Sequence, residues 1–252
     1  MKTSNKLLLT AIIITLVSLV FYDLMLKSSY LKGDYKDPFK DYVSLNFKDF
    51  KTIDLSASTA ANIILKQGPF SVRMDPSAAD FVKISQNAGT LHIDAAFSGS
   101  FNNPRAAYVL VISCPDLKQF NADARYMAGD QPVIDTLASE DFKWRPSIIS
   151  GFTLDSLTIT EKHAASIILK GNKIRALNAV IGIDNGSRSN MTIADDNQLQ
   201  SAELNILNKS QLRLNGAAIN NLKYQLADSA KLISTGTSQN LIKNNQSKSY
   251  HK

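Results

Sequence analysis

The chain has 252 residues, of which 44% are hydrophobic and 20% charged, so it can bury a core and lacks the composition of a disordered protein. Its formal net charge is +6, but much of the basic excess lies at the two ends of the chain. This distribution offers no basic face, so we expect no nucleic-acid binding. Cys114 is the single cysteine, which excludes an intramolecular disulfide and a cysteine-based metal site.

The first element in chain order is an apolar segment at residues 7–26, interrupted only by Asp23. A helix of this length spans about 30 Å, which is the thickness of a bilayer core. The segment ends without an Ala-x-Ala processing pattern. We therefore predict an uncleaved signal anchor, a single transmembrane helix that leaves residues 1–6 as a cytoplasmic stub and the bulk of the chain outside the cytoplasm. Secretion after signal cleavage is the alternative.

Residues 27–49 mix Lys, Asp and aromatic residues, and we interpret them as a juxtamembrane spacer. From Phe50 onward apolar residues alternate with polar ones, and turn-forming residues separate the runs at 67–69 and 87–89. Short alternating runs bounded by such residues indicate strands. We expect an all-β structure over residues 50–240.

Apolar groups recur every 20 to 24 residues in the last hundred positions. One series is Ile167/Leu169, Met191/Ile193, Leu212/Leu214 and Leu232, and a second is Ala179/Ile181/Ile183, Ala202/Leu204/Ile206 and Leu222/Tyr224/Leu226. A fixed period of this size predicts a solenoid, in which each rung packs on its neighbours. A leucine-rich repeat does not fit, because two strands fill each period. In the stacked rungs we expect Ile181, Leu204 and Tyr224 in one column.

Residues 121–150 break this rhythm and form an irregular insert. The insert holds Tyr126 and the only tryptophan, Trp144. Two interpretations stay open: a connection that packs its aromatic residues over one end of the solenoid, or a recognition loop on a rigid scaffold. Residues 241–252 are expected to form a flexible basic tail.

Several segments resemble a family of bacterial envelope proteins known as auto-transporter adhesin head domains. The matching segments are the strand at residues 50–55, the turn at 63–68, the strand at 89–93 and the strand at 109–117 that ends in Pro-x-Leu. The resemblance covers residues 45–240. It implies a right-handed parallel β-helix, secreted or anchored in a Gram-negative envelope, and no catalytic residues. With the predicted anchor, this places the chain in a bacterial inner membrane with its bulk in the periplasm.

Few residues are arranged for chemistry. His92, His163 and His251 have no second His or Cys at ligand spacing, so we expect no metal site. Phosphate-binding and dinucleotide glycine patterns are missing from the sequence, so no cofactor is expected. Asp195 and Asp196 are adjacent carboxylates, and paired carboxylates carry glycoside hydrolysis. Because they directly follow a predicted strand, a turn is the simpler interpretation.

We therefore predict a membrane-anchored, non-enzymatic, adhesin-like module that binds an envelope protein or a glycan. One alternative is a polysaccharide-active β-helix enzyme that uses Asp195 and Asp196. The other is a structural envelope spacer without a specific partner. Mixed polar groups along a stacked outer column favour a binder, whereas columns of Asn and Ser favour a spacer.

Overall fold

A computed structural model describes residues 3–33, 37–98, 108–136, 146–240 and 242. The chain forms two compact units, Met1–Asp41 and Tyr42–Lys252. The predicted basic tail, apart from residue 242, lies outside the described residues.

The first unit contains one helix, α1 (Thr3–Lys32), which begins before and ends after the predicted 7–26 segment. Its residues Thr3–Leu31 are long and apolar enough to cross a membrane, with a mean hydropathy of 2.3. Large apolar side chains are exposed on it, from Leu7 at 68% to Leu31 at 74%. A retained anchor and a signal sequence share this length and composition. The helix takes up the first part of the predicted spacer.

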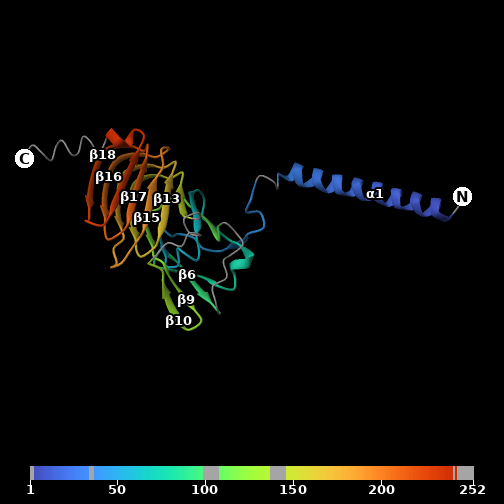
Figure 1. The fold of residues 1–252 in the computed structure, drawn as a ribbon, viewed down its shortest axis with the longest axis horizontal. Helices are drawn as coiled ribbons and strands as arrows, with labels where there is room; N and C mark the ends of the chain where they lie inside the picture. The colour runs from blue at the N-terminus through green and yellow to red at the C-terminus, as the bar shows by residue number, and fades with distance from the viewer. Residues whose placement is uncertain (1–2, 34–36, 99–107, 137–145, 241, 243–252) are drawn as a thin grey trace, which may run out of the picture. The chain divides into compact units, whose positions relative to one another are not determined.

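The second unit consists mostly of strands in two sheets (Figure 1). One sheet has the order β1-β4-β7-β3-β11-β13-β15-β17-β19 and the other β10-β9-β6-β2-β8-β12-β14-β16-β18, with β5 paired to β6. The first sheet contains β1 (Val43–Leu45), β3 (Ile63–Gln67), β4 (Ser71–Met74), β7 (Leu110–Cys114), β11 (Ser147–Ser150), β13 (Ser166–Lys170), β15 (Asn190–Ile193), β17 (Gln211–Asn215) and β19 (Lys231–Thr235). The second contains β2 (Thr52–Leu55), β5 (Val82–Asn87), β6 (Thr90–Phe97), β8 (Gln119–Ala122), β9 (Arg125–Ala128), β10 (Gln131–Ile134), β12 (Thr153–Glu161), β14 (Lys173–Ile181), β16 (Gln198–Ile206) and β18 (Ala218–Leu226). A short 3-10 helix, η2 (Pro76–Ala78), precedes β5.

From β11 to β19 the chain alternates between the two sheets, and each strand lies parallel to the next strand of its own sheet. The predicted first series is a set of register partners: Ile167 pairs with Met191, Met191 with Leu212, and Leu212 with Leu232. Side chains alternate between core and solvent because the period of a strand is two. The apolar inward residues of both sheets therefore form one continuous core.

The predicted column of Ile181, Leu204 and Tyr224 is wrong at its first member, which should be Ala179, two residues earlier on the same strand. Leu204 pairs with Ala179 and Tyr224, whereas Ile181 pairs with Ile206. Ile183 is 40% exposed and lies beyond the end of β14. The cause is the connection at residues 182–189, which is longer than the matching connections at 162–165 and 207–210. Extra loop residues shift the sequence spacing without shifting the register of the strands.

The N-terminal half differs from an all-parallel arrangement, so the sheets are mixed. β4 lies antiparallel to β1 and β7, β5 to β6, and β9 to β10. Two-residue connections enforce the β5–β6 and β9–β10 pairs, because strands joined so tightly can only pair antiparallel. Ala88 and Gly89, with φ of 46° and 76°, make the β5–β6 turn, which suits the primed hairpin turns.

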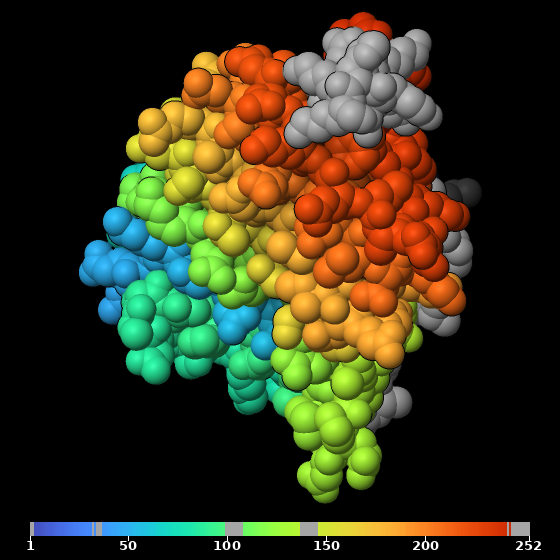
Figure 2. All heavy atoms as spheres, turned by 90° about the vertical axis from the view of Figure 1, so that its left-hand side faces the viewer, coloured from blue at the N-terminus to red at the C-terminus, as the bar shows by residue number. Residues whose placement is uncertain are grey.

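The predicted irregular insert at 121–150 contains regular structure. It includes the β9–β10 hairpin and strand β11. Gly129, with φ of 59°, begins the two-residue hairpin turn, where a positive φ is required. The hairpin projects from the body of this unit in two views (Figures 1 and 2).

Buried polar side chains close the corners between the sheets. Asn172 and Asn197 are fully buried, and Asn172 Nδ2 donates to Asn197 Oδ1 at 2.9 Å. Asn197 Oδ1 also accepts from the Asn172 backbone N–H at 3.1 Å, and Asn197 Nδ2 donates to the Leu169 carbonyl at 2.7 Å. These bonds satisfy turn groups that are shielded from water, which a folded chain requires.

Gly182 marks a close approach at the opposite corner. Its φ is 81°, and a Cβ at this position would stand 2.8 Å from the Leu207 carbonyl oxygen and against Ser210 Oγ. Only glycine combines this backbone angle with so little space.

Candidate functional site

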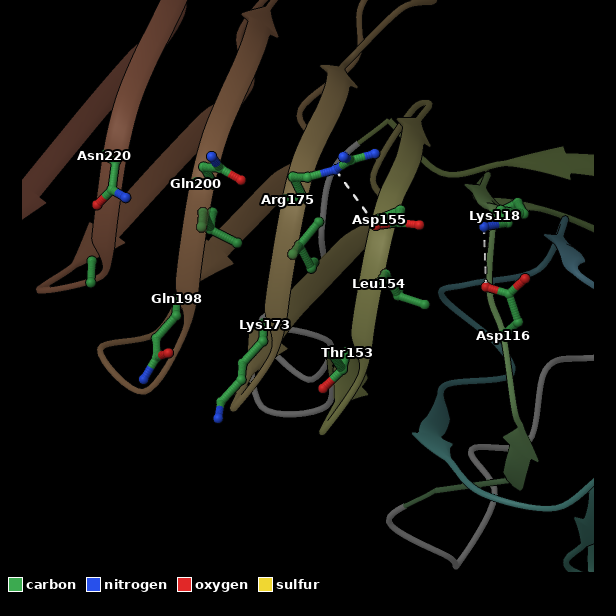
Figure 3. Close-up of a pocket in the computed structure, with 13 residues that line it drawn as sticks. Asp116, Lys118, Thr153, Leu154, Asp155, Lys173, Arg175, Gln198, Gln200 and Asn220 are labelled. Carbon is green, nitrogen blue, oxygen red and sulfur yellow. Dashed lines mark ion pairs between the residues drawn. The ribbon is translucent and has the colours of Figure 1, made fainter.

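A polar groove of about 900 Å3 crosses the outer face of the second sheet (Figure 3). It runs over the first residues of β12, β14, β16 and β18 and reaches the segment that precedes β8. Its lining is Asp116, Lys118, Thr153, Leu154, Asp155, Lys173, Ile174, Arg175, Gln198, Leu199, Gln200, Ala218 and Asn220.

The period of two places the polar residues of the groove in two parallel rows. Lys173 pairs in register with Thr153 and Gln198, and Gln198 pairs with Ala218. The second row lies two residues further along each strand and holds Asp155, Arg175, Gln200 and Asn220 (Figure 3). Neighbouring strands stand about 4.8 Å apart, so each row offers one side chain at that interval. All eight side chains are exposed.

Charged groups concentrate at one end of the groove. Arg175 Nε lies 3.5 Å from Asp155 Oδ1, and Lys118 Nζ lies 3.3 Å from Asp116 Oδ1 (Figure 3). Lys51 Nζ lies 3.4 Å from the other oxygen of Asp116. Lys173 has no carboxylate partner among the described residues. The lining thus carries three cations against two carboxylates at this end, and neutral amides at the other.

A second cluster lies at the corner where β8, β12 and β14 end. Asp123, His163 and Asp184 bring one ligand atom each within 4.8 Å of one another. Asp123 and His163 are buried, and Asp184 is half-buried. These side chains can hold a proton or a cation between them.

Of the two residues that the sequence singled out for recognition, Tyr126 is not part of the groove lining. Tyr126 is on β9, half-buried, and its ring packs edge-on against Phe97 with 5.6 Å between centroids. Burial and the nearby charge of Asp135 raise the pKa of Tyr126. Trp144 lies outside the described residues. The packing of Tyr126 agrees with a structural contact in the small cluster around Ala57.

Asp195 and Asp196 form the turn between β15 and β16, and both are exposed. The turn interpretation of this pair is therefore correct. The catalytic alternative stays a hypothesis that rests on residue type alone.

Sequence reasoning missed both the groove and the corner cluster. The groove residues are the polar partners of the apolar ladder, so their spacing was visible, but their charges and amides follow no motif. Asp123, His163 and Asp184 are separated by 40 and 21 positions, and only the pairing of β8 with β12 and of β12 with β14 brings them together. Only Asp184 carried a signal, because it directly follows the predicted apolar group Ala179/Ile181/Ile183.

Comparisons with known proteins give structural likeness only. A scan against models of protein families finds no match, and a search of curated proteins finds none. A crystal structure from Bacteroides fragilis named a "putative adhesin" is 15% identical, with 78% of this chain and 94% of that chain covered and a TM-score of 0.48. A second chain of that name, from Parabacteroides merdae, is 10% identical, with 78% and 96% covered and a TM-score of 0.31. A "putative lipid binding protein" from Parabacteroides distasonis is 14% identical, with 78% and 94% covered and a TM-score of 0.28. At these TM-scores the likeness carries no argument about function.

Proposed function

We propose that this chain is a membrane-anchored, extracytoplasmic binding module of a bacterial envelope, without enzymatic activity. Its β-solenoid binds an extended glycan in the groove over β12, β14, β16 and β18. The observation that carries the proposal is the pair of polar rows on a parallel sheet, with the lining described above.

The chemistry of the rows favours a glycan over an extended peptide. A peptide strand is bound best at a sheet edge, where free main-chain groups pair with it. Most of the groove lies on a sheet face, over β12, β14 and β16, where each strand has a hydrogen-bonded neighbour on both sides, and only β18 is an edge strand. Gln198, Gln200 and Asn220 each offer a donor and an acceptor, which suits hydroxyl groups that also do both. The cations Lys118, Lys173 and Arg175 favour a glycan with acidic substituents.

The anchor and the solenoid rest on separate observations. The apolar helix α1 supports a membrane anchor by length and composition. The alternation between two parallel sheets from β11 to β19 supports a parallel β-helix in that part of the chain. A rigid stack of parallel strands holds the two rows in fixed positions, which lowers the entropy lost on binding.

The composition of the outer columns favours a binder over a spacer. The stacked Asn side chains found here, Asn172 and Asn197, are buried at a corner. The outer rows instead mix amides, cations and carboxylates. For a spacer we would instead expect columns of Asn and Ser on the solvent-exposed face.

The test is binding of the full-length protein, in detergent micelles, to immobilised bacterial polysaccharides that include neutral and uronic-acid-containing chains. Arg175→Ala should weaken binding by about ten- to a hundredfold, as expected for a lost hydrogen bond to a charged group, and Gln200→Ala by about two- to tenfold, as expected for a lost neutral hydrogen bond. Arg213→Ala is the matched control, because Arg213 is exposed on β17 of the other sheet. Equal binding by all variants contradicts the groove, and release of shortened chains contradicts the absence of enzymatic activity.

A further inference from the structure

Three strand ends bring Asp123, His163 and Asp184 to one corner. In register, Glu161 pairs with both Ala122 and Ile181. Asp123, His163 and Asp184 follow these three paired residues by one, two and three positions. Because β8, β12 and β14 run parallel, the residues beyond their carboxyl ends collect on the same side of the sheet.

Asp123 fixes the orientation of the His163 ring. Asp123 Oδ1 lies 2.6 Å from His163 Nδ1 and accepts from the Ala124 backbone N–H at 2.7 Å. Asp123 Oδ2 lies 2.6 Å from Arg125 Nε. The two residues are only 6% and 9% exposed, so the contact is shielded from water. A carboxylate on one ring nitrogen is the usual arrangement behind a histidine that binds metal through the other.

Asp184 is the carboxylate near the second nitrogen of the ring. His163 Nε2 lies 3.7 Å from Asp184 Oδ2, which is too long for a hydrogen bond. Nε2 has no hydrogen-bond partner among the described residues. Two ligands held at about 2.1 Å on a tetrahedral ion stand about 3.4 Å apart. The gap therefore fits one metal ion after a movement of a few tenths of an ångström.

The backbone of the site is held in place. The His163 N–H donates to Ser187 Oγ at 2.9 Å, and Ser189 Oγ donates to the His163 carbonyl at 3.0 Å. The Asp184 carbonyl accepts from Ser187 Oγ at 2.6 Å and from Asn208 Nδ2 at 3.1 Å. The long connection at 182–189 thus holds both candidate ligands.

We propose that His163 Nε2 and Asp184 Oδ2 bind a divalent transition-metal ion of the zinc class. Imidazole nitrogen with carboxylate oxygen suits such ions. Asp123 is a positioning residue that orients the ring. The Asp184 side chain is 36% exposed, so water completes the coordination. Lys162 Nζ lies 3.6 Å from Asp184 Oδ2 and competes with the ion for this oxygen.

The experiment is a zinc titration of the full-length metal-free protein in detergent micelles, read by competition with a chromogenic chelator. His163→Gln and Asp184→Asn should each weaken zinc binding at least tenfold, and Asp123→Asn about ten- to a hundredfold. Lys162→Gln should tighten binding by about three- to tenfold, because it removes a cation beside the ligand oxygen. A gain of affinity cannot arise from damage to the fold.

The matched control is His92→Gln. His92 Nδ1 lies 3.3 Å from Asp54 Oδ2 in a half-buried pair on neighbouring strands, so it offers the same residue types with less burial than His163 has. Zinc affinity should stay unchanged in this variant. X-ray absorption at the zinc edge should show one imidazole in the wild type. The proposal is overturned if His163→Gln binds zinc as the wild type does, if the loss follows His92→Gln, or if Lys162→Gln does not tighten binding.

Discussion

Glu161 places an acidic side chain inside an apolar column of the core. Its register partners are Ala122 and Ile181, and it is fully buried. Neither carboxyl oxygen has a hydrogen-bond partner among the described residues. Burial therefore raises the pKa of the Glu161 carboxyl well above its ordinary value. A buried charge without a partner is so costly that the group folds as the neutral acid.

The pH dependence follows from this shift. Above the ordinary pKa of about 4.3, the unfolded chain releases the Glu161 proton and the folded chain keeps it. The stability that this group contributes is fully present below that pKa and is lost as the pH rises towards the folded pKa. The slope reaches about 1.4 kcal/mol per pH unit, so the loss between pH 5 and pH 7 is up to about 2.7 kcal/mol. Glu161→Met removes this dependence and keeps the side-chain volume.

The assay is urea unfolding of the full-length protein in detergent micelles, followed by far-ultraviolet circular dichroism at pH 5, 6 and 7. Subtracting the Glu161→Met variant from the wild type cancels the titration of all other groups. The control is Glu203→Gln, which changes an exposed carboxylate on β16 and should show no such difference. A wild-type minus Glu161→Met difference that stays constant within about 0.5 kcal/mol across these pH values would refute the reasoning.

Three further predictions concern packing. Gly182→Ala should lower the free energy of unfolding in urea by about 2–5 kcal/mol, because it adds backbone strain and overpacking. Gly186→Ala should lower it by only about 1–2 kcal/mol, because Gly186 has a φ of 80° but open space around it. Equal losses in the two variants would contradict this reasoning. Asn197→Ala should lower the free energy of unfolding by about 1–3 kcal/mol, because it leaves buried amide groups of Asn172 without hydrogen-bond partners. An unchanged urea midpoint would show that the hydrogen bonds between Asn172 and Asn197 are dispensable. Burial and the charge of Asp116 raise the pKa of the Cys114 thiol to about 12, so a disulfide reagent at pH 8 should react only after unfolding.

The apolar alternation predicted the inward residues of the later strands well. Ile167, Met191, Leu212 and Leu232 stack as their spacing indicated. The second series failed at Ile183, because a spacing of 20 to 24 residues cannot show in which connection the additional residues lie. Period-two patterns locate the faces of a strand, but they do not fix its partner when a loop changes length.

For the antiparallel pairs of the N-terminal half, the sequence indicated the turns but not the pairing of the strands. The two-residue connection at Ala88 and Gly89 was identified as a break between runs, yet its hairpin geometry follows from positive φ angles that only the structure reports. The resemblance to a parallel β-helix family pointed away from such hairpins. The region 121–150 was hardest to predict, because the short strands β9 and β10 have little apolar alternation.

Local chemistry along the chain determined that residues 7–26 are apolar and helical, that residues 50–240 contain strands, and that turns are built on Asn, Asp and Gly, since each depends on residues close in sequence. The tertiary structure alone decided which strands are neighbours. It therefore decided that Lys173, Gln198 and Thr153 share one row of the groove, that Glu161 lies in an apolar column, and that His163 stands between two aspartates. Those contacts depend on register between distant strands, which the free energy of the whole core selects and no local pattern encodes.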